Sequence, residues 1–416
     1  MSSPSRIEAD YLVETSCDPR AAAETMAGEQ SSGTFVSLPG ETPELKERSA
    51  ARIEALEVVG ESASPALPGA FSSDQAIQRA RVTLSWPYEN LGPSLPNLMA
   101  TVAGNLFELN EFSGLKITDI RLPSEFAAAY AGPKFGVEGT RALAGVQGRP
   151  LIGTIIKPSV GLGPEETADL CRQLVAADID FIKDDELQSD GPACPFADRA
   201  KQVMSVINGQ ADQTGRKAMY AFNITGELDE MRRRHDLVLE VGGSCIMVSV
   251  NSVGLVGLTE MARHRQLPIH AHRNGWGYLS RHPLLGWSYC AWQKFWRLAG
   301  VDHMHVNGLS NKFCEDDESV IASARACLTP MFADKPCVAM PVFSSGQTVR
   351  QAGETFKALG SSDLIFAAGG GIMGHPDGPG AGVESLKLAW EAALAGHDLE
   401  TFAAERPSLS RALEAF

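Results

Sequence analysis

The chain has 416 residues, of which 44% are hydrophobic, so it can bury a sizeable core and exceeds one ordinary domain unless most of it forms an α/β barrel. Asp and Glu outnumber Lys and Arg by 51 to 36, and the formal charge of −15 leaves no broad basic face for nucleic acid or an anionic membrane. A site for an anionic small molecule would therefore have to be a local positive pocket.

Residues 1–145 predict a compact α+β domain of the ferredoxin-like kind. The strand pattern of alternating apolar residues is expected at 11–16, 51–59, 79–86 and 115–122. Helices are expected at 21–27 and 96–107. The segment 60–73, rich in Pro, Gly and Ser, is expected to be a loop within this domain.

Residues 146–416 predict a (β/α)8 TIM barrel with C-terminal helices, because strand-like runs alternate there with amphipathic helical runs. A doubly wound open sheet is the alternative, but no dinucleotide glycine fingerprint follows the first strand. Helices are expected at 165–176, 227–241, 348–359 and 385–395. The eight strands are expected at 152–157, 181–186, 218–225, 245–250, 268–273, 303–307, 337–344 and 364–370.

A charged tetrad, Lys183-Asp184-Asp185-Glu186, directly follows the short apolar stretch 179–182. Strand side chains alternate with period two, so Lys183 and Asp185 are expected on one side, with Glu186 just beyond on the exit loop. Hard oxygen ligands of this kind suit Mg²⁺, and a lysine could join them by capturing CO₂ as a carbamate. A solvated charge run is the alternative interpretation.

Five of the other seven predicted strand ends carry ionisable or glycine-rich residues as well, and in a TIM barrel the chemistry lies at the carboxyl ends of the strands. Singly, each has an ordinary explanation as a surface lysine, a core histidine, an ion-pair partner or a turn. Loops after strands 7 and 8 of such barrels often bind phosphate through backbone amides. The residues concerned are Lys157, His270 to Arg273, His303 to Gly308 with Lys312 in the following loop, Ser344 to Gly346, and Gly369 to Gly371.

Taken in order, these segments resemble the RuBisCO large-chain superfamily. The similarity starts at Gly153-Thr154-Ile155-Ile156-Lys157-Pro158 and continues through 180–186, the histidine strands, Lys312, Ser344 and the triple glycine. The N-terminal part adds a segment at 29–34 and a helix at 96–108 that contains Gly104-Asn105. The resemblance covers about residues 10 to 400.

The resemblance implies roles for individual residues. Lys183 would be the carbamylated lysine of a Mg²⁺ site completed by Asp185 and Glu186, and Lys157 would be the acid/base lysine. His272 would be a second polar group at the metal side, and Lys312 the lysine of a mobile loop. The residues implied in substrate and phosphate binding are Arg273, His305, Ser344, Gly346, Gly369, Gly370 and Thr34, with Glu29 and Asn105 supplied by the neighbouring subunit of a homodimer or an assembly of dimers.

Departures from the carboxylase pattern argue against CO₂ fixation on ribulose bisphosphate. Ser159 stands where the carboxylase has a second lysine, and Trp276 where it has a histidine. Ser345 replaces one of two paired glycines, and the loop before Lys312 lacks the carboxylase consensus. The chain also stops at Phe416, with little tail to latch over that loop. The pattern resembles a RuBisCO-like protein of the type IV group.

The resulting hypothesis is Mg²⁺-dependent enolisation or C–C cleavage of a phosphorylated ketose or 3-oxo sugar acid, such as decarboxylation or transcarboxylation/hydrolysis of 3-oxo-isoapionate 4-phosphate. A methionine-salvage enolase or isomerase acting on a methylthio-ketose phosphate is the alternative. Two rivals from other classes are a non-catalytic sugar-phosphate-binding protein and a zinc amidohydrolase. The last would need His-x-His on the first strand and an aspartate after the eighth, where this chain has lysine and glycines.

We expect a cytoplasmic protein. The eight cysteines are scattered without a Cys-x-x-Cys pair, which favours reduced thiols over disulfides or a zinc site. The first residues include no basic-then-apolar leader, and no apolar run reaches ~18 residues.

Overall fold

A computed structural model describes residues 5–33, 38–71 and 76–416. Packing divides the chain into two compact units. The first comprises Met1–Tyr130 with Gly275–Leu298, and the second comprises Ala131–Asn274 with Ala299–Phe416. The sequence-based domain boundary at 145/146 stays a prediction, and the two units are described separately below.

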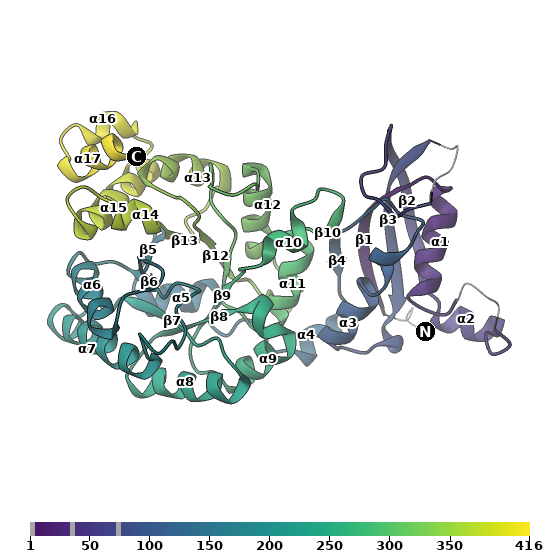
Figure 1. The fold of residues 1–416 in the computed structure, drawn as a ribbon, viewed down its shortest axis with the longest axis horizontal. Helices are drawn as coiled ribbons and strands as arrows, with labels where there is room; N and C mark the ends of the chain where they lie inside the picture. The colour runs from purple at the N-terminus through teal and green to yellow at the C-terminus, as the bar shows by residue number, and fades with distance from the viewer. Residues whose placement is uncertain (1–4, 34–37, 72–75) are drawn as a thin grey trace. The chain divides into compact units, whose positions relative to one another are not determined.

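The first unit contains a five-stranded sheet in the order β10-β4-β1-β3-β2 (Figure 1). Strands β1 to β4 pair antiparallel in the order 4-1-3-2, which is the ferredoxin-like arrangement expected for this part of the chain. Alternate residues of β1, from Ile7 to Val13, are buried, so one face of the sheet carries the core. The strands are β1 (Arg6–Thr15), β2 (Arg52–Ser62), β3 (Ile77–Pro87), β4 (Gly114–Arg121) and β10 (Leu285–Trp287).

The helices of the first unit include the two that the sequence predicted, although the second of them, α3, ends at Val102 and not at 107. They are α1 (Pro19–Glu29), α2 (Pro43–Ser49), α3 (Leu95–Val102), α4 (Ser124–Ala129), α10 (Trp276–Ser280) and α11 (Tyr289–Ala299, whose last residue belongs to the second unit). The loop predicted from residue 60 onward is wrong at its start. β2 continues to Ser62, because Glu61 and Ser62 still pair with Gln78 and Ile77 of β3.

The second unit is a closed barrel of parallel strands in the order β11-β12-β13-β5-β6-β7-β8-β9. All eight strands predicted from the sequence are present, and the fold class is confirmed. All eight end one to three residues earlier than predicted, and the difference is largest for β6, which ends at Lys183, and β13, which ends at Ala367. The strands are β5 (Leu151–Ile155), β6 (Phe181–Lys183), β7 (Met219–Asn223), β8 (Cys245–Ser249), β9 (Ile269–His272), β11 (His303–His305), β12 (Met340–Phe343) and β13 (Ile365–Ala367).

Helices alternate with these strands and surround the barrel (Figure 1). No helix in the described ranges is long and apolar enough to cross a bilayer. The helices are α5 (Gly136–Ala144), α6 (Pro164–Ala176), α7 (Phe196–Thr214), α8 (Leu228–Glu240), α9 (Val250–His264), α12 (Asp317–Leu328), α13 (Ala352–Leu359), α14 (Gly369–Met373), α15 (Pro379–Ala395), α16 (Leu399–Ala403) and α17 (Pro407–Ala415).

An apolar cluster forms one part of the barrel core. It includes Leu151, Phe181, Met219, Met340 and Ile365, which begin five of the strands. Two of these strands end in a polar residue, β6 at Lys183 and β7 at Asn223. The core therefore supports the barrel from its amino-terminal side and leaves the carboxyl ends for polar groups.

Candidate active site

Lys157 and Lys183 meet two carboxylates where β5 and β6 end. Lys157 Nζ donates to Asp185 Oδ2 at 2.6 Å and to Ser159 Oγ at 2.8 Å. Lys183 is buried, donates to the backbone carbonyl of Asp184 at 2.7 Å, and has its Nζ 3.8 Å from Glu186 Oε2. These groups lie together because β5 and β6 are neighbouring parallel strands that pair Ile155 with Lys183.

The electrostatic environment sets the protonation of this group. Burial lowers the pKa of Lys183, an effect that the carboxylates of Glu186 and Asp185 oppose and the Lys157 charge reinforces. Burial alone would raise the pKa of Asp185, but the hydrogen bonds from Lys157 and the amide of Leu187 outweigh it and leave that pKa lowered. Asp185 therefore stays ionised, while the Lys183 amine loses its proton more readily than a solvated lysine.

Asp184 points away from this group. Its carboxylate accepts from Tyr220 OH at 2.6 Å, from Arg199 Nη2 at 3.2 Å and from the amide of Asn223 at 2.8 Å. The Asn223 side chain in turn donates to the carbonyl of Glu186 at 3.2 Å. Sequence reasoning did not single out Tyr220, Arg199 or Asn223, which fix the backbone that carries Asp185 and Glu186.

Three histidine side chains, on β9 and β11, lie next to this group. His272 Nε2 lies 3.4 Å from Glu186 Oε2, and its ring centroid lies 4.7 Å from that of His305. His305 contacts His270, with 2.8 Å between their Nε2 atoms, and its Nδ1 lies 3.1 Å from Ser344 Oγ. Burial, with a smaller effect of Lys183, lowers the pKa of His272 to about 4. Burial and the neighbouring histidines hold the pKa of His305 well below its usual value, so both rings are neutral at pH 7.

Arg273, at the end of β9, forms an ion pair that the sequence did not reveal. Its Nη2 lies 2.7 Å from Glu315 Oε2, and Asn307 Nδ2 donates to the same oxygen at 2.6 Å. Ser345 Oγ donates to Asn307 Oδ1 at 2.8 Å. Both Asn307 and Ser345 have left-handed backbone, with φ of 69° and 72°, which is uncommon for residues other than glycine.

Lys312 follows β11, Gly346 follows β12, and Gly369 and Gly370 follow β13. Lys312 is exposed, its backbone amide donates to the Ser345 carbonyl at 3.2 Å, and Gly346 lies against its side chain. The triple glycine begins the short helix α14 at Gly369, where the predicted strand 364–370 would still continue. Gly369 lies next to Lys157, because a Cβ placed on it would be 3.8 Å from Lys157 Cε. Gly370 is the second residue of the same helix.

The remaining predicted residues belong to the first unit. Glu29, at the end of α1, accepts a hydrogen bond of 3.2 Å from Asn105 Nδ2, and both residues are exposed. Thr34 lies outside the described residues. The structure thus brings together the barrel residues in one group and Glu29 with Asn105 in another.

Comparison with known families and proteins identifies the fold. Residues 10–126 match the family described as ribulose bisphosphate carboxylase large chain, N-terminal domain, and residues 136–416 match its catalytic domain. The chain belongs to the RuBisCO large-chain family. Both matches together span most of the chain, as the resemblance of its motifs implied.

Individual members of the RuBisCO large-chain family are close in sequence and structure. The 3-oxo-isoapionate-4-phosphate transcarboxylase/hydrolase of Xanthobacter autotrophicus is 62% identical over 98% of this chain and 98% of its own length. The 3-oxo-isoapionate-4-phosphate decarboxylase of Rhizobium rhizogenes is 42% identical over 98% of this chain and 97% of its length. The crystal structure of a rubisco-like protein from Burkholderia fungorum, 47% identical, superposes with a TM-score of 0.93 over 99% of this chain and 100% of that chain.

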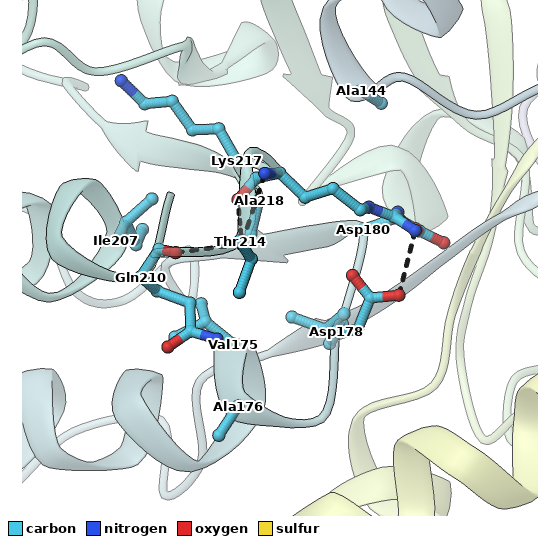
Figure 2. Close-up of a pocket in the computed structure, with 12 residues that line it drawn as sticks. Ala144, Val175, Ala176, Asp178, Asp180, Ile207, Gln210, Thr214, Lys217 and Ala218 are labelled. Carbon is cyan, nitrogen blue, oxygen red and sulfur yellow. Dashed lines mark hydrogen bonds and ion pairs between the residues drawn. The ribbon is translucent and has the colours of Figure 1, made fainter. Parts of the chain in front are cut away.

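Two other features of the RuBisCO-family barrel lie away from these residues. A cavity of about 240 Å³ lies beside Asp178, Asp180 and Lys217, whose positions are drawn in Figure 2. These residues precede β6 and β7, so the cavity is at the amino ends of the strands, opposite the ends that carry Lys183 and Asn223.

The second feature is a trio of His235, Asp236 and His264, the one set of His, Cys, Asp and Glu within the described ranges whose ligand atoms are close enough to hold a metal ion. The Gln266 amide donates to His235 Nε2 at 3.1 Å, so the proton of that ring is on Nδ1, which faces Asp236. A metal ion would have to displace this proton, and the trio is better explained as a hydrogen-bonded contact between α8 and α9.

Proposed function

We propose that the chain is a Mg²⁺-dependent enzyme that cleaves a C–C bond next to the carbonyl group of a phosphorylated 3-oxo sugar acid. The proposed substrate is 3-oxo-isoapionate 4-phosphate, and the reaction is transcarboxylation/hydrolysis or decarboxylation. The observation that carries the proposal is the contact of Lys157 with Asp185 beside the buried amine of Lys183. The names of relatives at 62% and 42% identity support the choice of substrate.

The residues at the end of β6 fit a magnesium site that includes a lysine carbamate. A carbamate forms from a neutral amine, and burial lowers the pKa of Lys183 in that direction. Carbamylated Lys183, Asp185 and Glu186 would then hold the ion with oxygen ligands, which Mg²⁺ prefers. When bound, Mg²⁺ supplies positive charge that lowers the cost of an enolate at the substrate carbonyl, by roughly several kcal/mol.

Side chains of the protein provide the proton and orient the groups around the substrate. In decarboxylation the bond between the carboxylate carbon and the carbon next to the ketone breaks, its electron pair forms an enolate, and CO₂ leaves. Lys157 then donates a proton to that carbon, for which its position beside Asp185 and Gly369 suits it. His272, as a neutral imidazole, orients Glu186.

Arg273, Lys312, His305 and Ser344 are proposed to bind the phosphate, and the backbone at Gly346, Gly369 and Gly370 the other anionic end. Ser159 holds Lys157 with a hydrogen bond of 2.8 Å where the carboxylases have a second lysine, which supports an activity other than CO₂ fixation. We further propose a cytoplasmic homodimer, or an assembly of dimers, in which Glu29 and Asn105 complete the neighbouring subunit's site together with Thr34.

Turnover of 3-oxo-isoapionate 4-phosphate by the purified chain, with Mg²⁺ and bicarbonate, tests this function. We expect product in the wild type, and in Lys157→Met a rate lower by roughly 10²-fold or more, the usual contribution of an acid/base group. Lys201→Met, at an exposed lysine of α7, is the matched control and should retain full activity. No conversion of this substrate together with conversion of a methylthio-ketose phosphate would contradict the proposal and favour a methionine-salvage enzyme.

A further inference from the structure

The carboxylate of Glu315 accepts hydrogen bonds from three side chains. Oε2 accepts from Arg273 Nη2 at 2.7 Å and from Asn307 Nδ2 at 2.6 Å. Oε1 accepts from Ser319 Oγ at 2.9 Å. The pair between Arg273 and Glu315 is largely buried, with side chains 7% and 15% exposed, so little solvent screens it.

The ion pair between Arg273 and Glu315 weakens the attraction of Arg273 for a second anion. The guanidinium charge is already balanced by a carboxylate on the same side of the site. An anion that approached while Glu315 stayed in place would gain almost nothing from Arg273 and would be repelled by Glu315. A strong anion site at Arg273 therefore requires Glu315 to leave.

We propose that Glu315 is a specificity-determining residue that occupies Arg273 in place of the substrate and is displaced by its phosphate group. This inference rests on the proposed function, in which Arg273 binds phosphate. Glu315 was not among the site residues predicted from the sequence.

The Glu315 carboxylate has a hydrogen-bond partner that lies away from Arg273. Ser319 lies in the first turn of α12, a helix of 12 residues, and its hydroxyl binds the oxygen of Glu315 that does not face Arg273. Rotation of the side chain can thus release Arg273 while Glu315 keeps its bond to Ser319.

Displacement of Glu315 from Arg273 is easier for a phosphate group than for a carboxylate group of a ligand. A monocarboxylate carries the same charge as Glu315 but must compete with a group that is tethered to the site, at an effective concentration in the millimolar range or above. A phosphate monoester carries a charge of about −1.5 to −2 at pH 7 and three acceptor oxygens, so it can displace Glu315. For a substrate with both groups, the phosphate end is selected for Arg273, which leaves the carboxylate end for the side of Lys157 and Lys183.

Calorimetric titration of the whole chain with inorganic phosphate and, separately, with acetate tests the proposal without turnover. We expect Glu315→Gln to bind phosphate more tightly than the wild type, by roughly tenfold or more. Acetate should bind Glu315→Gln measurably and the wild type not at all. Glu318→Gln, which removes the same charge from an exposed position of α12, should match the wild type.

Adding Arg273→Gln to Glu315→Gln should abolish the gain in phosphate affinity, because the gain acts through the guanidinium. Unchanged or weaker phosphate binding in Glu315→Gln would overturn the inference. If that variant does not fold, a crystal structure of the wild type with phosphate decides. Phosphate on Arg273 with Glu315 moved beyond 4 Å supports displacement, and phosphate there with the ion pair intact overturns it. A wild type that binds phosphate as described but fails to turn over 3-oxo-isoapionate 4-phosphate contradicts the proposed substrate and not the role of Glu315.

Discussion

Asp184 and Asp185 are adjacent acids with opposite surroundings. Asp185 faces Lys157 at the barrel's carboxyl end, whereas Asp184 is enclosed by Tyr220, Arg199 and the Asn223 amide. Burial and the Asp184 charge raise the pKa of Tyr220 well above its usual value, so the phenol remains a donor to Asp184. One acid is therefore available to a metal ion and substrate, and the other secures the strand on which the first is placed.

We predict that His303 makes the protein less stable at acidic pH. Burial lowers the pKa of His303 to about 4, against a smaller opposing effect of Asp302, while the unfolded chain has the ordinary value of 6.5. Between pH 6.5 and 4 the unfolded state binds a proton that the native state does not, so stability falls as pH falls through this window. From pH 7 to pH 5 this single group costs about 2 kcal/mol.

Urea unfolding at pH 7 and pH 5 measures this effect. His303→Gln should lose about 2 kcal/mol less than the wild type between the two pH values. His397→Gln, at a histidine exposed to water, is the control and should leave the difference unchanged. An equal loss in His303→Gln and wild type would show that His303 takes up its proton in the native state as readily as in the unfolded chain.

At the scale of elements, the position of an acid along its strand decides its role. Asp302 immediately precedes β11 and is buried at the amino ends of the barrel strands. Its oxygens accept from the amides of Phe135 and Gly136, at 2.7 and 2.9 Å, and from Arg265 Nη1 at 2.8 Å. Asp185, by contrast, follows β6 at the carboxyl ends, where barrel enzymes place their chemistry.

Exchange of either acid for its amide should separate these roles. Asp302→Asn leaves Arg265 buried without a countercharge and should lower the free energy of unfolding by about 3 kcal/mol or more. Asp185→Asn loses a partner to the partly exposed Lys157, and we expect a change within about 1 kcal/mol but no turnover. Urea unfolding and the substrate assay, run on both variants, check this. A stable Asp302→Asn protein would contradict the role of Asp302 as an anchor.

The elements themselves could be predicted because their patterns are local. Strand-like runs that alternate with amphipathic helical runs located all eight barrel strands, and period two predicted Lys183 and Asp185 on one side. β10 was missed because its three residues, Leu285 to Trp287, form a strand only by pairing with β4, some 170 positions earlier in the chain. Glu315 was missed for a related reason. Its pairing with Arg273 depends on the path of the loop after β11, which no periodicity records.

At the scale of the whole molecule, Glu29, Asn105 and Thr34 are the part of the proposed site that the barrel does not supply, and the structure describes the first two of them. These two form an exposed hydrogen-bonded pair in the first unit, between the end of α1 and the segment after α3. An exposed pair of this kind contributes little to the stability of its own subunit. Its proposed role in the neighbouring subunit's site explains why both residues match the family pattern.

Mixing two inactive variants tests whether the sites are shared. Glu29→Ala should be inactive because it damages the site of the neighbour, and Lys157→Met because it damages its own. If subunits re-pair at random, half of the dimers are mixed. Each mixed dimer has one site with both defects and one with neither, so about a quarter of the wild-type activity should return. Activity that stays at the level of the separate variants, while mass spectrometry detects mixed dimers, would mean that each subunit uses its own Glu29.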